Sequence, residues 1–359
     1  MTEPALDIKQ AWTARELTHE LQLFRAQFSP GGGHVAAVGL DGLVHVWRLE
    51  DEEKITLEGH QTWISSLVFH PDGKRLFTAD YHGVVHCWDF AGATQPMWTI
   101  AEADRGNVRA LVVSPDGRQL ISAGDDRVIK VWDCATGEPV TRIEGHAECI
   151  FSLAISPDGK HLVSGDLLGV IRQWQVGSWK EERQLDAALL HTRKDTFLAD
   201  VGGVRSLAFS GDGRRLAAGG MKEAKSNAFC PGKPIVLVFD WASGQQETEL
   251  CIKGKSDGPF NALCFLEDGS LAGHTEILHA ASELTFWDPT RPEPLHSIPN
   301  GSAYDLSLHP DGRQLLVPTY VSGGSSGNGA QKKHRENYVP NRTTLKIFKL
   351  FARPEAKPE

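Results

Sequence analysis

Short apolar segments alternate with turns of the Ser-Pro-Asp-Gly type along the chain, and the same unit occurs seven times. In the third unit, the apolar positions of residues 108–113 predict a short strand, and residues 114–117 supply the turn that follows it. Residues 119–123 predict a second strand, residues 128–132 are rich in β-branched side chains, and residues 139–143 predict an outer strand. Each unit therefore predicts four short strands joined by tight turns.

A constant spacing between an apolar residue and a Trp indicates that these units are true repeats. In the first four units the spacing is 19 residues, between Phe28 and Trp47, Phe69 and Trp88, Val113 and Trp132, and Ile155 and Trp174. In the last three units it is 30, 22 and 40 residues, between Phe209 and Phe239, Phe265 and Trp287, and Leu308 and Phe348. A period of about 40 to 45 residues is typical of β-propeller blades, in which a four-stranded sheet recurs around an axis.

Short motifs inside the units resemble those of WD-repeat β-propellers. They are Gly59-His60 and Gly145-His146 before first strands, Ser164-Gly165 in a second strand, and Trp88-Asp89, Trp132-Asp133 and Trp287-Asp288 at the ends of third strands. The resemblance covers roughly residues 8–350 and implies an all-β, seven-bladed propeller of four-stranded antiparallel blades. It implies a single domain over residues 1–359, with blades that begin near residues 18, 59, 103, 145, 199, 255 and 298.

In this family a His, a Ser or Thr, an Asp and the Trp form a hydrogen-bonded tetrad within a blade. By sequence register, four blades hold three of the four groups: His19, Asp41 and Trp47; His60, Thr78 and Trp88; Ser122, Asp126 and Trp132; and His146, Ser164 and Trp174. The missing group is replaced by Ala37 in the first blade, His82 in the second, Asp104 in the third and Leu168 in the fourth. We therefore expect no complete tetrad.

The two ends of the chain predict how the ring closes. The chain stops soon after residues 345–348, so the seventh blade lacks an outer strand of its own. Residues 8–17 precede the first blade at the place where an outer strand belongs. We expect this N-terminal strand to complete the last blade, which hides sheet edges that would otherwise template aggregation.

Extra residues fall at one position in the last three units. The fifth, sixth and seventh units carry 11, 3 and 21 additional residues between their second and third strands. That turn lies on the same face as the connections between blades, and the longest connection, from Gln175 to Gly203, precedes the fifth blade. Long loops on a rigid scaffold often carry function, so these insertions could together form a binding surface on one rim. The alternative is that they are tolerated surface insertions with no role.

Basic residues concentrate in two of these insertions. Lys222 and Lys225 lie in the segment 221–235, and Lys333 and Arg335 lie in the segment 321–342. A local basic rim on an acidic chain favours an acidic or phosphorylated partner segment. A solvated charge run is the alternative.

Two aromatic residues of the second unit are further partner-binding candidates. Trp63 precedes the first strand and Tyr81 lies in the turn between the second and third strands, so both belong to the same face. Exposed aromatic side chains are frequent binding hot spots. The alternative is that the two rings pack on each other as a local lid.

Composition narrows the class of protein. The net charge of −9 argues against a generic nucleic-acid binder. Residues 1–10 contain no apolar segment and no run of 18 apolar residues occurs, so we expect neither a signal peptide nor a membrane span. We therefore expect a soluble, cytoplasmic protein. In such a reducing compartment, its six cysteines, which show no Cys-x-x-Cys spacing, are expected to be free thiols.

No catalytic, cofactor-binding or metal-binding set is predicted. His60 and His146 occupy the family's structural His position in different blades, which argues against a metal pair. The predicted function is a non-catalytic scaffold that binds a protein partner on the loop-bearing face. The alternative is a propeller enzyme or small-ligand binder with a site at the axial channel, which paired carboxylates or histidines in the channel would favour. The sequence carries no signal for the oligomeric state.

Overall fold

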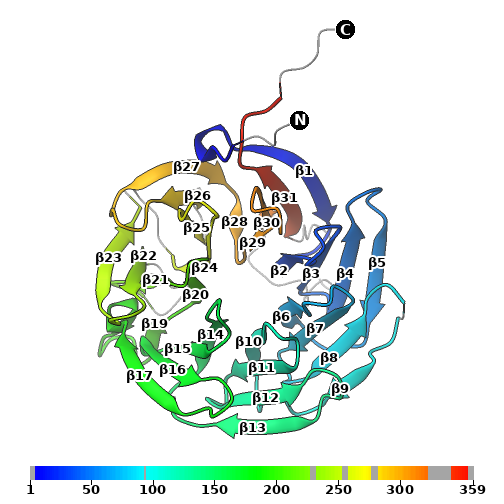
Figure 1. The fold of residues 1–359 in the computed structure, drawn as a ribbon, viewed down its shortest axis with the longest axis horizontal. Helices are drawn as coiled ribbons and strands as arrows, with labels where there is room; N and C mark the ends of the chain where they lie inside the picture. The colour runs from blue at the N-terminus through cyan, green and yellow to red at the C-terminus, as the bar shows by residue number, and fades with distance from the viewer. Residues whose placement is uncertain are drawn as a thin grey trace.

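Apart from one two-stranded hairpin, the described strands form seven antiparallel sheets that stand around a central axis like the blades of a propeller (Figure 1). The computed structural model describes residues 5–92, 94–226, 232–252, 258–275, 282–321 and 341–354. This part of the chain contains strands and two short 3-10 turns, η1 (Ile8–Gln10) and η2 (Ala188–Leu190), and no α-helix. The predicted all-β, seven-bladed fold is confirmed.

The first four blades follow one plan, in which consecutive strands pair from the axis outward. Blade 1 contains β2 (Leu23–Phe28), β3 (His34–Gly39), β4 (Leu43–Arg48) and β5 (Lys54–Glu58). Blade 2 contains β6 (Ile64–Phe69), β7 (Arg75–Asp80), β8 (Val85–Asp89) and β9 (Trp98–Ile100). Blade 3 contains β10 (Val108–Val113), β11 (Gln119–Gly124), β12 (Ile129–Asp133) and β13 (Pro139–Ile143). Blade 4 contains β14 (Ile150–Ile155), β15 (His161–Asp166), β16 (Val170–Gln175) and β17 (Glu181–Asp186).

Blades 5 and 6 keep this plan with longer or shorter strands. Blade 5 contains β20 (Ser206–Phe209), β21 (Arg215–Lys222), β22 (Lys233–Asp240) and β23 (Gln246–Cys251). Blade 6 contains β24 (Phe260–Phe265), β25 (Leu271–Thr275), β26 (Ser282–Trp287) and β27 (Pro294–Asn300). The connection between blades 4 and 5 forms a separate hairpin of β18 (His191–Arg193) and β19 (Asp200–Gly202).

The N-terminal strand completes blade 7, as predicted. In this sheet β1 (Trp12–His19) pairs antiparallel with β31 (Arg342–Lys349), and β31 pairs with β30 (Gln314–Val321). The inner edge of blade 7 is split into β28 (Ser302–Ala303) and β29 (Ser307–Leu308), both paired with β30. The outer strand runs from Trp12 to His19, not over residues 8–17, because the chain first forms η1.

The Ser-Pro-Asp-Gly segments close the hairpins between first and second strands. In blade 3 the Ser114 hydroxyl donates to Asp116 (2.6 Å) and accepts from the backbone N–H of Gln119 (2.9 Å). Gly117 has φ 71°, a left-handed conformation that favours glycine. In blade 2, His70 takes the place of the serine, and its Nε2 donates to the carbonyl of Gly117 in blade 3 (2.7 Å). These turns therefore fix each hairpin and also link neighbouring blades.

The apolar core lies between blades. One cluster joins Val38 and Val44 of blade 1 to Leu67, Leu76 and Trp88 of blade 2, and all five side chains are buried. Each sheet has two faces to bury, so the ring provides a neighbour for both.

The long connection before blade 5 packs against that blade's extended hairpin. Phe197 and Val201 of the connection contact Met221 and Ala224 of blade 5, and Lys194 Nζ donates to the carbonyl of Ala224 (2.8 Å). The segments 227–231, 276–281 and 322–340, which hold the tips of the three insertions, lie outside the described residues.

The remaining expectations concern cysteines and membrane spans. Five cysteines of the described residues, Cys87, Cys134, Cys149, Cys251 and Cys264, are free thiols. None of the helices that the structure describes is long and apolar enough to span a bilayer.

Candidate functional site

Blade 2 contains a complete tetrad, so the expectation that no blade has one is wrong. His60 Nδ1 donates to Asp80 (2.7 Å), the Thr78 hydroxyl donates to His60 Nε2 (2.7 Å), and Trp88 Nε1 donates to Thr78 (2.8 Å). Burial alone would raise the pKa of Asp80, but hydrogen bonds from His60 and backbone N–H groups lower it. The acid of the tetrad is therefore Asp80 at the end of β7. The sequence register places the acid at position 82, which is occupied by a histidine.

Blade 4 repeats this network. His146 bonds Asp166 (2.8 Å) and Ser164 (2.7 Å), and Trp174 Nε1 donates to Ser164 (2.8 Å). Asp166 occupies the strand end, and its second oxygen accepts from the backbone N–H of Leu168 (3.0 Å). The prediction that Leu168 replaces the acid is therefore wrong, because a strand-end carboxylate also reaches the histidine.

Blade 3 departs from the tetrad as expected. Trp132 Nε1 donates to Ser122 (2.9 Å), but Asp104 stands in place of the histidine. Lys130 forms ion pairs with Asp126 and with Asp104 (3.8 Å for the latter). Burial raises the pKa of Asp104 to about 6, although Lys130 opposes this shift.

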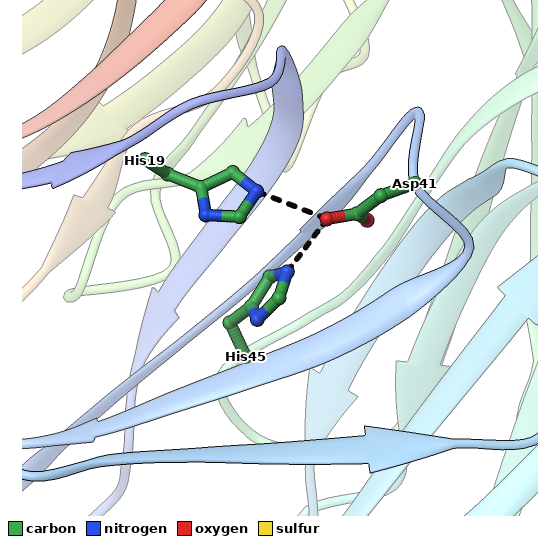
Figure 2. Close-up of side chains that lie close together, drawn as sticks. All are labelled: His19, Asp41 and His45. Atoms are coloured by element: carbon green, nitrogen blue, oxygen red, sulfur yellow. Dashed lines mark hydrogen bonds and ion pairs between the residues drawn. The ribbon is translucent and has the colours of Figure 1, made fainter.

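Blade 1 has a different arrangement, shown in Figure 2. His19 Nε2 lies 2.9 Å and His45 Nε2 lies 2.7 Å from the same carboxylate oxygen of Asp41. Ala37 provides no hydroxyl to this group, as the sequence register predicted. Two histidines therefore share one carboxylate at the start of the first blade.

A cavity of about 200 Å³ lies on the axis, lined by the inner strands of all seven blades. Its charged lining residues are Arg25, Arg109, Arg205 and Asp305. The described lining contains one carboxylate and no histidine, lysine or cysteine. The paired carboxylates or histidines that would favour an enzyme are absent from the described lining of this cavity.

Two of these arginines flank one aromatic ring. The guanidinium carbons of Arg109 and Arg205 lie 4.7 Å and 4.1 Å from the ring centre of Phe151. Arg109 also pairs with Asp125 (2.5 Å). Arg109 and Phe151 lie at β-bulges, which re-aim side chains relative to the normal alternation of a strand. These residues were not predicted from the sequence, although they share one position in the aligned repeats, four residues before the apolar residue that leads into the turn.

The two candidate aromatics of blade 2 do lie together. The rings of Trp63 and Tyr81 meet edge to face with centroids 5.6 Å apart, and the N–H of Tyr81 donates to the carbonyl of Trp63 (3.1 Å). Tyr81 is nevertheless 41% exposed. The pair is therefore both a local contact and an accessible aromatic surface.

The candidate basic residues lie elsewhere. Lys222 pairs with Glu249 of the same blade (3.0 Å), and Lys225 is exposed on the blade 5 extension. Lys333 and Arg335 lie outside the described residues. The structure thus places Lys222 and Lys225 three blades away from Trp63 and Tyr81.

Comparison with known proteins identifies four of the seven repeats as WD repeats. The family model "WD domain, G-beta repeat" matches residues 51–89, 95–133, 137–175 and 192–222. Over 69 residues the chain is 35% identical to a nuclear distribution protein nudF of Aspergillus terreus, a match that covers 19% of this chain and 16% of that protein. It is 33% identical over 69 residues to a nuclear distribution protein PAC1 of Coccidioides posadasii, covering 19% and 15%. With four matched repeats inside a ring of seven four-stranded blades, the chain is a WD-repeat β-propeller.

Proposed function

We propose that this protein is a non-catalytic scaffold that binds a protein segment on the face bearing Trp63 and Tyr81. The observation that carries the proposal is the accessible aromatic pair of that face, in which the rings of Trp63 and Tyr81 meet edge to face and Tyr81 is 41% exposed. The axial cavity adds three arginines and one aromatic ring, Phe151. Arginine and large aromatic side chains are the types enriched at binding hot spots. The described lining of the axial cavity holds one carboxylate, Asp305, beside three arginines, and no histidine, lysine or cysteine that could act as a second acid or base.

The matched relatives support this proposal only at the level of architecture. Both are named for nuclear distribution, and the matches cover about a sixth of their length. The free thiols of the described cysteines support a reducing compartment, and we place the protein in the cytoplasm as part of the proposal.

The test compares two double variants as affinity baits in extract from the source cells. Trp63→Ala with Tyr81→Ala should lose most partner capture, because the variant removes the accessible aromatic surface. The matched control is Met97→Ala with Val140→Ala, which truncates side chains 56% and 51% exposed near the outer strands β9 and β13. Both variants should keep the wild-type circular dichroism spectrum. Equal capture by the two variants would contradict the assignment of the face.

A second binding region is the basic rim, defined as Lys222, Lys225, Lys333 and Arg335. We propose that it recruits an acidic or phosphorylated part of the partner. The ion pair of Lys222 with Glu249 (3.0 Å) reduces the positive charge that Lys222 presents to a partner.

A further inference from the structure

Two histidines and an aspartate converge where the N-terminal strand leaves blade 7 and the chain enters blade 1. His19 is the last residue of β1, Asp41 lies in the turn before β4, and His45 lies within β4. The ligand atoms of the three side chains all lie within 4.8 Å of one another. Among the residues that the structure describes, this is the one group of three or more metal-ligating side chains with that geometry.

The convergence is specific to blade 1. In blades 2 and 4 the tetrad histidine uses both ring nitrogens, one toward the aspartate and one toward the hydroxyl. In blade 1, Ala37 removes the hydroxyl, and His45 adds a second imidazole that faces the same carboxylate. The position of His45 is occupied by His86 in blade 2, whose Nε2 has no hydrogen-bond partner among the described residues, and by Lys130 in blade 3. Within the described part of the chain, only blade 1 therefore aims two imidazole nitrogens at one carboxylate oxygen.

We propose that His19, Asp41 and His45 bind a divalent transition-metal ion of the Zn²⁺ type. Imidazole nitrogen and carboxylate oxygen are ligands that Zn²⁺ accepts at about 2.0 to 2.2 Å, with water free to take a fourth position. A tetrahedral ion at these bond lengths separates its ligand atoms by roughly 3.3 Å. The present separations of 2.9 Å and 2.7 Å from Asp41 need to open by about 0.4 Å and 0.6 Å to reach this value. The two histidine nitrogens lie within 4.8 Å of each other and need to reach the same spacing.

The surroundings of His45 fit the proposed ion, because its side chain is only 3% exposed and is held between two polar neighbours. The His45 Nδ1 lies 3.3 Å from the Thr56 hydroxyl, a partner that can fix the ring once Nε2 binds the ion.

One neighbour opposes metal binding in the present arrangement. Lys54 Nζ lies 3.2 Å from His19 Nδ1, and Nδ1 must carry a proton when Nε2 binds an ion. The ammonium must therefore turn away before the ion enters. Lys54 is an exposed residue, so this rotation moves it toward solvent. Removing the ammonium should increase the affinity.

The bound ion would stabilise ring closure. His19 belongs to the strand that completes blade 7, whereas Asp41 and His45 belong to blade 1. A coordination bond to each side would link β1 to blade 1 in addition to its ladder with β31. An ion that binds only the folded state raises stability by mass action.

The experiment titrates untagged full-length protein, stripped of metal with a chelator that is then removed. Co²⁺ should bind as one ion per chain with a visible absorption band, and Zn²⁺ should displace it. At 100-fold excess over Kd, Zn²⁺ should raise the melting temperature by roughly 3–5 °C, and Mg²⁺ at the same concentration should not.

Variants assign the ligands. His45→Gln should weaken Co²⁺ binding at least about 100-fold, and Lys54→Gln should strengthen it. The matched control is His86→Gln, which changes the same strand position in blade 2 and should leave the affinity within about twofold. Equal binding by wild type and His45→Gln, or loss of binding in His86→Gln, would overturn the proposal.

A measurement on the wild type keeps the proposal testable if His45→Gln does not fold. Hydrogen exchange with and without Zn²⁺ should slow in β1 and in residues 41–45. Protection confined to another part of the ring, or no binding of Co²⁺ at all, would overturn the proposal as well.

Discussion

At the scale of single residues, the carboxylate of Asp80 at the end of β7 accepts several hydrogen bonds within blade 2. Asp80 accepts hydrogen bonds from His60 (2.7 Å) and from the backbone N–H groups of His82 (2.9 Å) and Val84 (3.0 Å). Asp80→Ala leaves these donors without their acceptor and should lower the free energy of unfolding by roughly 2–4 kcal/mol, measured by urea denaturation. The control His82→Ala removes an exposed side chain and should change it by less than about 0.5 kcal/mol. Equal effects of the two substitutions would contradict the role of Asp80 as the acid of the tetrad.

The same residues explain what sequence register can and cannot predict. The Trp positions and the hydroxyls of Thr78 and Ser164 are predicted correctly, because the 19-residue spacing fixes them along the strands. The predicted place of the acid is wrong in two blades, since a carboxylate can reach the histidine from the turn, as Asp41 does, or from the strand end, as Asp80 does. Spacing along the chain does not distinguish two backbone positions whose side chains meet at one point.

A half-buried carboxyl in the channel makes stability depend on pH. Burial raises the pKa of Asp305 to about 6, although Arg25 at 3.7 Å and two backbone N–H groups oppose this shift. An unfolded aspartate has a pKa of about 3.9, so the native protein holds the proton more tightly. The contribution of this group to stability is therefore present below about pH 4 and is lost as the pH rises through about 6. Asp305→Asn should abolish this part of the pH dependence.

The measurement for Asp305 is urea denaturation of wild type and variant at several pH values. The stability of Asp305→Asn relative to wild type should increase between about pH 4 and pH 7. A difference that stays constant over this interval would show that the carboxyl does not titrate with a raised pKa.

At the scale of elements, the N-terminal strand is the closure of the ring. Leu17 of β1 is buried and packs with Leu345 and Ile347 of β31. Deleting residues 1–17 removes most of this strand and exposes the edge of β31, which should lower stability by several kcal/mol out of a typical total of about 5–15. A shorter deletion, of residues 1–5 alone, serves as the control. An unchanged melting temperature in the longer deletion would contradict the role of β1.

Elements with the regular period are predictable, and irregular ones are not. The four strands of blade 3 follow directly from alternating apolar positions and turn residues. The inner edge of blade 7 breaks into β28 and β29 at residues 304–306, where Asp305 accepts a hydrogen bond from the N–H of Ala26 in blade 1 (3.0 Å). The β18–β19 hairpin depends on packing of Phe197 against blade 5, a tertiary contact without a local signal.

At the scale of the whole molecule, the ring collects residues that are distant in sequence. Arg25, Arg109 and Arg205 come from blades 1, 3 and 5 and line one cavity. Each lies in a different repeat and matches no motif by itself. The repeat period predicts the propeller, whereas the chemistry of its axis becomes visible only when seven inner strands are superposed.

The last prediction concerns the basic rim, whose charges are spread over two insertions. If these insertions form one site, their cations act together on an acidic partner, and association should slow as salt rises, because exposed charges are screened over about 8 Å at physiological ionic strength. Reversing Lys225, Lys333 and Arg335 to Glu should reduce the association rate more than it raises the dissociation rate, since rim charges steer encounter. The fold should be retained, because Lys225 lies outside the blade strands: β21 ends at Lys222, three residues earlier. Surface plasmon resonance with a partner captured by the wild-type chain gives both rates at low and high salt. Equal association rates for wild type and triple variant at both salt concentrations would leave the insertions as spacers and confine binding to Trp63 and Tyr81.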